Sequence, residues 1–65
     1  MPMVQINMVK GRTQEQIEGL ISEVSKTVSE IADCPITSVH VVINEVEANH
    51  WGLGGETVEK RLAKK

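Results

Sequence analysis

The chain has 65 residues, 40% of them hydrophobic, a formal net charge of −2 and a single cysteine. A chain this short is expected to form one domain, 1–65, and to bury only about 60% of the surface that its unfolded form exposes. Cys34 has no partner for an internal disulfide, and its spacing from His40 and His50 matches no zinc site. We therefore expect no metal and no cofactor, and we expect stability to come from burial shared between copies of the chain.

Charge is divided unevenly along the sequence. Residues 1–56 hold eight acidic and three basic side chains, a net charge of −5, whereas residues 57–65 hold one acidic and four basic ones, a net charge of +3. An acidic body with Trp51 as its only aromatic side chain argues against a nucleic-acid partner, which needs clustered bases and stacking rings. The C-terminal bases are expected to form a solvated, partly frayed tail, made of Lys60, Arg61, Lys64 and Lys65.

No segment has the composition of a membrane span or a secretion signal. The longest unbroken apolar run is Val41-Val42-Ile43, far below the roughly 20 residues that a spanning helix needs. The N-terminus has no basic segment leading into an apolar one. We therefore expect a cytoplasmic protein that does not contact a membrane.

The first expected element is a strand over residues 3–8. Val4, Ile6 and Met8 share one face while the intervening residues share the other, which is the period-two pattern of a sheet. Residues 10–12 then turn the chain.

An amphipathic helix follows. Thr13 and Gln16 have the spacing of a capping box, which places the start of the helix at Thr13. Apolar residues then recur every three or four positions and form one stripe, made of Ile17, Leu20, Ile21, Val24, Val28, Ile31 and Ala32. Pro35 disfavours helical backbone at Cys34, so the helix is expected to end near Asp33.

Residues 39–45 predict a second strand, and the long helical crossover permits parallel pairing with the first. Val39, Val41 and Ile43 would then lie under the helix. A loop at 47–50 and the glycine-rich segment 51–55 indicate a tight hairpin or a close chain crossing. The expected fold class is α/β, a single β-α-β unit with parallel strands and a short C-terminal hairpin.

The second face of this sheet has nothing in the chain to cover it. It carries Met3, Val9 and Val42 among polar residues, and no second long helix exists. We expect another subunit to cover this face, so that oligomerisation completes the fold.

Pro2 is the most informative candidate for chemistry. If Met1 is removed, Pro2 becomes a secondary amine at the start of a strand. Such an amine can act as a base on carbon acids when desolvation and nearby cations bring its pKa near working pH. The alternative is that a second-position proline is incidental.

Arg12 is a candidate anion-binding residue. It is the only arginine of the acidic body and it precedes a helix start, where free N–H groups favour a carboxylate or phosphate. The alternative is a surface arginine paired with Glu15 or with an acid of another subunit.

Other catalytic patterns are absent from the sequence. The glycine cluster at 52–55 lacks the third glycine of the dinucleotide fingerprint and does not lie between a first strand and its helix, so a turn is expected. Cys34, His40 and His50 lie on elements with no predicted meeting point, so no Cys/His or Ser/His/Asp set can be assembled.

Taken together, the order and spacing of these features resemble one family. They are Met1-Pro2 with a strand, Gly11-Arg12-Thr13, the long amphipathic helix, Thr37-Ser38-Val39 with its strand, and His50-Trp51-Gly52-Leu53-Gly54-Gly55-Glu56. The family is that of 4-oxalocrotonate tautomerase, also called 2-hydroxymuconate tautomerase. The resemblance extends from the N-terminus to about Glu56.

The resemblance implies a tautomerase-like fold assembled as a homohexamer, a trimer of dimers, with sites built from neighbouring subunits. It implies that Pro2, freed of Met1, is the general base that moves a proton between the enol oxygen and a carbon of a 2-hydroxydienoate. Arg12 would then hold a substrate carboxylate. Trp51, where the family usually has phenylalanine, would form an apolar wall that lowers the pKa of Pro2, although a lone aromatic is more often an interface or core residue.

His40 departs from the family pattern, in which an arginine follows Ser-Val in the second strand. An imidazole lacks the planar, permanently charged fork of a guanidinium. We hypothesise that His40 weakens turnover of 2-hydroxymuconate relative to arginine-bearing members, or shifts preference toward a monocarboxylate such as an arylenolpyruvate. The alternative is a satisfied interface histidine.

Two rival functions remain open at this point. One is an oligomeric tautomerase-fold module without efficient activity, because a retained Met1 would make the Pro2 nitrogen an amide. The other is a ribbon-helix DNA binder, which fits the acidic body poorly and would need salt-sensitive DNA binding to support it.

Overall fold

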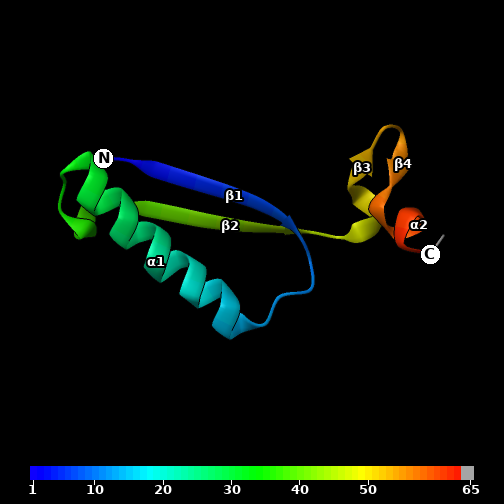
Figure 1. Cartoon of the computed structure of the whole chain (residues 1–65), viewed down its shortest axis with the longest axis horizontal. Helices are drawn as coiled ribbons and strands as arrows, with labels where there is room; N and C mark the ends of the chain where they lie inside the picture. Colours follow the sequence, from blue (N-terminus) through cyan, green and yellow to red (C-terminus); the bar gives the residue numbers. More distant parts are fainter. Residues whose placement is uncertain (64–65) are drawn as a thin grey trace.

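The computed structural model describes residues 1–63, which form a β-α-β body and a smaller C-terminal arm (Figure 1). The body consists of strand β1 (Met3–Val9), helix α1 (Gln14–Ala32), the short 3-10 helix η1 (Ile36–Ser38) and strand β2 (His40–Val46). The arm, residues 48–63, consists of the 3-10 helix η2 (Ala48–His50), strands β3 (Gly52–Leu53) and β4 (Glu56–Thr57), and helix α2 (Val58–Ala63).

The two long strands pair in parallel, as the sequence predicted. Their register matches Val4 with Val41 and Ile6 with Ile43, and these four side chains are half-buried on the face that α1 covers. The crossover through α1 makes this parallel pairing possible, because parallel neighbours cannot be joined by a tight turn. The second strand begins one residue later than expected, since Val39 caps η1 instead of entering the strand.

Local signals set both ends of α1. The Thr13 hydroxyl accepts a hydrogen bond from the Gln16 backbone N–H at 3.2 Å, and the Gln16 side chain accepts one from the Thr13 N–H at 3.0 Å. This reciprocal cap is the predicted capping box. At the other end Asp33 adopts a left-handed conformation with φ 54°, which stops the helix just before Cys34 and Pro35.

The arm has more structure than the sequence analysis expected. Gly54 and Gly55 have φ values of 60° and 87°, and they join β3 to β4 in the predicted tight hairpin. The expected loop at 47–50 contains η2. The expected frayed tail is wrong for Lys60 and Arg61, which lie in α2, because the Thr57 hydroxyl accepts from the Lys60 N–H at 3.2 Å and starts a helical turn there. Lys64 and Lys65 lie outside the described residues.

The body and arm leave the single chain unusually open. No side chain within residues 1–63 is fully buried, and the molecule measures 45 × 24 × 15 Å. Its radius of gyration is 15.1 Å, whereas a compact chain of this length has about 11 Å. A fold with this little interior must gain burial from other chains.

The face of the sheet opposite α1 is uncovered in the single chain, as predicted. Val42 is 42% exposed and Met3 is 60% exposed there. Between them lies a polar group in which the Asn7 side-chain oxygen accepts from Gln5 at 3.4 Å and from Asn44 at 3.2 Å. Within residues 1–63, none of the helices has both the length and the apolar character required to cross a bilayer.

Candidate active site

Pro2 lies immediately before β1, at the end of the sheet where α1 terminates (Figure 1). Its ring is half-buried, and its carbonyl accepts a hydrogen bond of 3.0 Å from the His40 backbone N–H. This bond extends the parallel ladder by one step beyond Met3. The residue is therefore fixed by the backbone, while Met1 before it is 90% exposed and makes its nitrogen an amide.

His40 is the first residue of β2 and the residue nearest to Pro2 among the other candidates. It pairs in register with Met3, so its side chain lies on the sheet face that α1 does not cover. The imidazole is exposed in the single chain. The sequence did not predict that Pro2 and His40 would be joined by a backbone hydrogen bond, because that contact depends on strand register.

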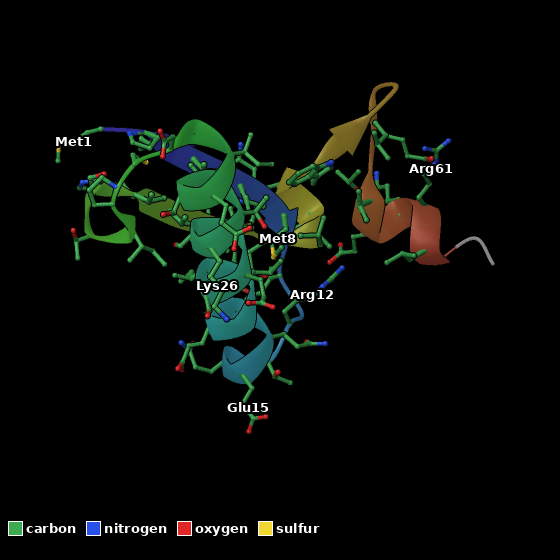
Figure 2. The ribbon with its side chains drawn as sticks, turned by 60° about the vertical axis from the view of Figure 1, so that its left-hand side comes forward. Met1, Met8, Arg12, Glu15, Lys26 and Arg61 are labelled. Carbon is green, nitrogen blue, oxygen red and sulfur yellow. The ribbon has the colours of Figure 1, made fainter. Side chains whose placement is uncertain are left out.

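Arg12 lies at the opposite end of β1, in the turn that precedes α1. Gly11 beside it has φ 146°, which is a conformation that favours glycine, and Thr13 after it caps the helix. Figure 2 shows the Arg12 and Glu15 side chains pointing in different directions. Arg12 makes no ion pair within residues 1–63, so the surface pairing with Glu15 does not form in the chain and the guanidinium is available to an anion.

Trp51 lies in the arm, between η2 and β3. Its ring is half-buried, and its carbonyl accepts a hydrogen bond of 2.8 Å from the Val58 N–H at the start of α2. This bond joins the segment before β3 to the start of α2. The indole is therefore held by the hairpin and α2, and not by the β-α-β body.

The four candidates fall into two groups at opposite ends of the sheet. Pro2 and His40 lie at the start of the strands, and Arg12 and Trp51 lie beyond their ends. The seven residues of β1 separate Pro2 from the turn before Arg12, which is roughly 23 Å at about 3.3 Å per residue. One chain therefore cannot bring its own base and its own arginine to the same small substrate.

Sequence reasoning missed the ion pair that holds the arm's base. The Lys10 ammonium contacts the Glu47 carboxylate at 3.1 Å, and the Lys10 N–H donates to the Val46 carbonyl at 2.8 Å. The two side chains are about 60% exposed, so the pair adds under about 1 kcal/mol but orients the turn before Arg12 against the start of the arm. No local signal reveals this pair, because its residues are 37 positions apart.

The described residues offer no alternative metal chemistry. No three His, Cys, Asp or Glu side chains of residues 1–63 are placed to hold one ion. Cys34 is a half-buried residue at the end of α1, where the Ser29 hydroxyl donates to its carbonyl at 2.6 Å. Its position is that of a helix terminus, as the sequence indicated.

A parallel β-α-β unit with a proline directly before its first strand and a hairpin arm after its second is the subunit expected of a tautomerase-type protein. The family described as Tautomerase enzyme matches residues 2–61. A 2-hydroxymuconate tautomerase of Pseudomonas putida is 48% identical over 60 residues, which cover 92% of this chain and 95% of that protein. The chain belongs to the tautomerase family.

Solved structures agree with this assignment. A 4-oxalocrotonate tautomerase isozyme from Methylibium petroleiphilum has a TM-score of 0.94 and 30% identity, covering 98% of this chain and all of that one. A heterohexamer 4-oxalocrotonate tautomerase from Chloroflexus aurantiacus has a TM-score of 0.88 and 32% identity, covering 92% and 97%. The predicted fold and family are confirmed, so the chain does not have the ribbon-helix fold of the DNA-binding alternative.

Proposed function

We propose that this tautomerase, after removal of Met1, interconverts the enol and keto forms of 2-hydroxydienoates, with Pro2 as the general base. The relatives named 2-hydroxymuconate tautomerase point to 2-hydroxymuconate as one substrate. An arylenolpyruvate is the second substrate class. The observation that carries the proposal is the near-complete match to such an enzyme, which begins at Pro2, where the backbone holds the nitrogen at an accessible end of the sheet.

The reaction needs only proton movement. Pro2 nitrogen accepts the proton of the enol hydroxyl, the O–H electrons form the carbonyl, and the shifted π electrons take the proton back at carbon. No electron is gained or lost overall and no group leaves, so neither an oxidant nor a metal ion is required. A positioned base of this kind contributes about 10²- to 10⁴-fold to the rate.

The other candidates have complementary roles in this proposal. Arg12 holds a carboxylate through charge-assisted hydrogen bonds, since its guanidinium has no ion-pair partner within residues 1–63. Trp51 supplies an apolar wall that disfavours the charged form of Pro2 and so lowers the pKa of that amine. His40 donates a hydrogen bond to the substrate at the position where the family resemblance implies an arginine.

Assembly is part of the same proposal. Because Pro2 and Arg12 lie at opposite ends of one chain, each site takes its base from one copy and its arginine and tryptophan from others. We propose a homohexamer, a trimer of dimers. The heterohexameric tautomerase among the similar structures supports an assembly of that size. A cytoplasmic role in aromatic catabolism is the setting that we propose for it.

The decisive experiment is an ultraviolet assay of ketonisation with 2-hydroxymuconate and with phenylenolpyruvate. It compares protein whose intact mass shows loss of Met1 with Pro2→Ala protein processed in the same way. We expect Pro2→Ala to lose at least about 10²-fold in kcat/KM. Equal rates for the two proteins would exclude Pro2 as the base.

The same mass measurement separates the proposal from its rival, the non-catalytic module. Protein from the native host that keeps Met1 would have an amide in place of the amine, and it would be expected to show no turnover. The similarity to named tautomerases over 92% of the chain does not favour that rival.

A further inference from the structure

Lys10 and Glu47 lie at the point where the two strands of the body diverge. The parallel register ends with Val9 opposite Val46, and one further bond, from the Lys10 N–H to the Val46 carbonyl at 2.8 Å, completes the ladder. Figure 1 shows the chain after β1 turning toward α1 and the chain after β2 continuing into the arm. The two residues directly after the last register pair are therefore the last place where one strand can hold the other.

An ion pair joins the two side chains at this point. The distance from Lys10 Nζ to Glu47 Oε1 is 3.1 Å, although the residues are 37 positions apart in the sequence. Two further ion pairs within residues 1–63 lie wholly inside α1 or wholly inside the arm. The elements of the arm also pack mainly on one another. The Lys10–Glu47 pair therefore ties the body to the residue from which the arm starts.

Each partner of this ion pair leads directly to a candidate site residue. The Glu47 carbonyl accepts a hydrogen bond of 2.9 Å from the His50 N–H, which closes the turn of η2, and Trp51 follows this turn at once. On the other strand, Arg12 follows Lys10 after a single glycine with φ 146°. The ion pair therefore lies between the short segment that carries Arg12 and the short segment that carries Trp51.

We propose that Lys10 and Glu47 form a positioning pair for the reaction, which holds Arg12 and Trp51 of one chain at a fixed spacing. This inference rests on the function proposed above, in which Arg12 binds the substrate carboxylate and Trp51 forms the apolar wall. One copy then supplies both groups to a site whose base, Pro2, comes from another copy. Neither Lys10 nor Glu47 contacts the substrate, and the pair acts through the two residues that do.

The expected effect of the pair is small. Both side chains are about 60% exposed, so water and salt screen their attraction, and such a pair changes an equilibrium by about two- to fivefold. A positioning role needs no larger effect, because a small displacement of a group that binds the substrate already lowers the rate. The pair should therefore change substrate binding measurably, with little influence on the folding of the body.

Charge masking is the alternative role for Glu47. Its carboxylate would then neutralise Lys10, so that Arg12 remains the one cation of this turn that attracts an anion. The two roles predict opposite signs. If the pair positions Arg12, loss of the Glu47 carboxylate raises KM. If Glu47 masks Lys10, the same loss frees a second cation beside the anion site and lowers KM.

Steady-state kinetics of Met1-free protein with 2-hydroxymuconate test the proposal. We expect Glu47→Gln and Lys10→Met each to raise KM by about two- to fivefold and to change kcat by less than about twofold, because the pair takes no part in the proton transfer. The double variant should be no worse than either single variant, since one substitution already breaks the pair. Lys10→Arg restores a long cationic side chain and should recover KM. A lower KM for Glu47→Gln, or additive losses in the double variant, would overturn the proposal.

Two further variants show whether the pair acts through Arg12. In an Arg12→Ala background, Glu47→Gln should lose most of its effect on KM, because the carboxylate anchor is already absent. Lys26→Met, which breaks the exposed ion pair with Glu23 on α1, is the matched control and should leave KM unchanged. A full-sized effect of Glu47→Gln in the Arg12→Ala background, or an equal effect of Lys26→Met, would also overturn the proposal.

Trp51 gives a readout that does not depend on turnover. It is the only aromatic residue of the chain, so polarised fluorescence of the substrate-free protein follows this side chain alone. Time-resolved anisotropy should show a larger nanosecond depolarisation for Glu47→Gln than for the unmodified chain or Lys26→Met, and an equal depolarisation would overturn the proposal. Unchanged turnover in Pro2→Ala with a loosened Trp51 in Glu47→Gln would refute the proposed function alone. Lost turnover in Pro2→Ala, with Trp51 and KM unaffected by Glu47→Gln, would refute the positioning role alone.

Discussion

The body and the arm are stabilised in different ways. In the body, a parallel strand pair and a capped helix bring apolar residues from sequence-distant strands together under α1. In the arm, strands of two residues and a helix of six residues are held by a glycine turn, the antiparallel β3–β4 pairing, the backbone hydrogen bond from Val58 to Trp51 and the Thr57 cap. The body therefore has a partial interior of its own, whereas the arm leaves Leu53 and Leu62 largely exposed.

The candidate site residues are also distributed between the two regions. The proposed base belongs to the body, and the proposed apolar wall belongs to the arm. Substitutions in the interior of the body and in the hairpin turn should act on folding, and substitutions at the candidate site should act on turnover. Five substitutions test this division.

Ile43→Ala should have the largest effect. Ile43 is half-buried beneath α1 and pairs with Ile6, so truncation removes apolar contact from the only interior of the body. We expect a loss of about 2 to 4 kcal/mol in the free energy of unfolding, measured by urea denaturation at fixed protein concentration. Ile36→Ala is the matched control, because Ile36 is 48% exposed and its loss should be below about 1 kcal/mol. Equal losses would mean that the body has no distinct core.

Arg12→Ala should lower turnover without lowering stability. Arg12 makes no ion pair within residues 1–63, so its removal breaks no contact described here. Loss of a charge-assisted bond of about 1.5 to 3 kcal/mol should lower kcat/KM for 2-hydroxymuconate by about one to two powers of ten. Lys26→Ala, which breaks only the exposed ion pair with Glu23 on α1, serves as the control and should change kcat/KM much less. The proposed carboxylate contact would be wrong if both variants kept full activity.

His40→Arg should raise activity toward the dicarboxylate. The new guanidinium would lie beside Pro2, at the first position of β2, and could bind a carboxylate or keto oxygen through two parallel donors. We expect kcat/KM for 2-hydroxymuconate to rise by about tenfold, with a smaller change for phenylenolpyruvate. An unchanged or lower value for the dicarboxylate would count against a role for this position in substrate binding.

Replacing one glycine of the body and one glycine of the arm by alanine should change the stability of the protein in opposite directions. Gly19 lies in the middle of α1 with open space around its α-carbon, so Gly19→Ala should stabilise the protein by about 0.5 to 1 kcal/mol. Gly55 in the hairpin has φ 87°, so Gly55→Ala should destabilise it by about 1 to 2 kcal/mol. Thermal unfolding of the two variants would give the comparison. If Gly55→Ala were neutral, the hairpin conformation would not be the one described.

The body was easier to predict from the sequence than the arm, because local patterns set the elements of the body. The alternation of Val4, Ile6 and Met8 and the capping pair Thr13 and Gln16 are local patterns, so the strand and helix of the body could be placed from the sequence alone. The α2 helix was missed because Glu59, Lys60 and Arg61 look like a solvated tail when Thr57 is not recognised as a cap. A strand of two residues is too short to show a periodic pattern, so nothing in the sequence indicated that Thr57 ends a strand and caps a helix.

The candidate site was predictable only as a set of residues. Pro2 and Arg12 could be singled out from the residues themselves, but the role of Trp51 and the joining of the three into one site came from resemblance, since no periodic pattern relates the start of one strand to a turn and a hairpin elsewhere. The Lys10–Glu47 ion pair and the Pro2–His40 bond both arise from strand register, which is set by the packing of the whole sheet. In the assembly proposed above, the two ends of the sheet meet through other copies of the chain, and no local signal in the sequence encodes that contact.

The hydrogen bond between the Pro2 carbonyl and the His40 N–H has a consequence for maturation of the protein. The bond uses the oxygen of Pro2 and not its nitrogen, and Met1 projects beyond the last rung of the ladder. An aminopeptidase can therefore remove Met1 without breaking any hydrogen bond of the strand pairing. Excision would free the Pro2 amine while the strand pairing stays intact, so in the function proposed above a single peptide cleavage would produce the active base without refolding.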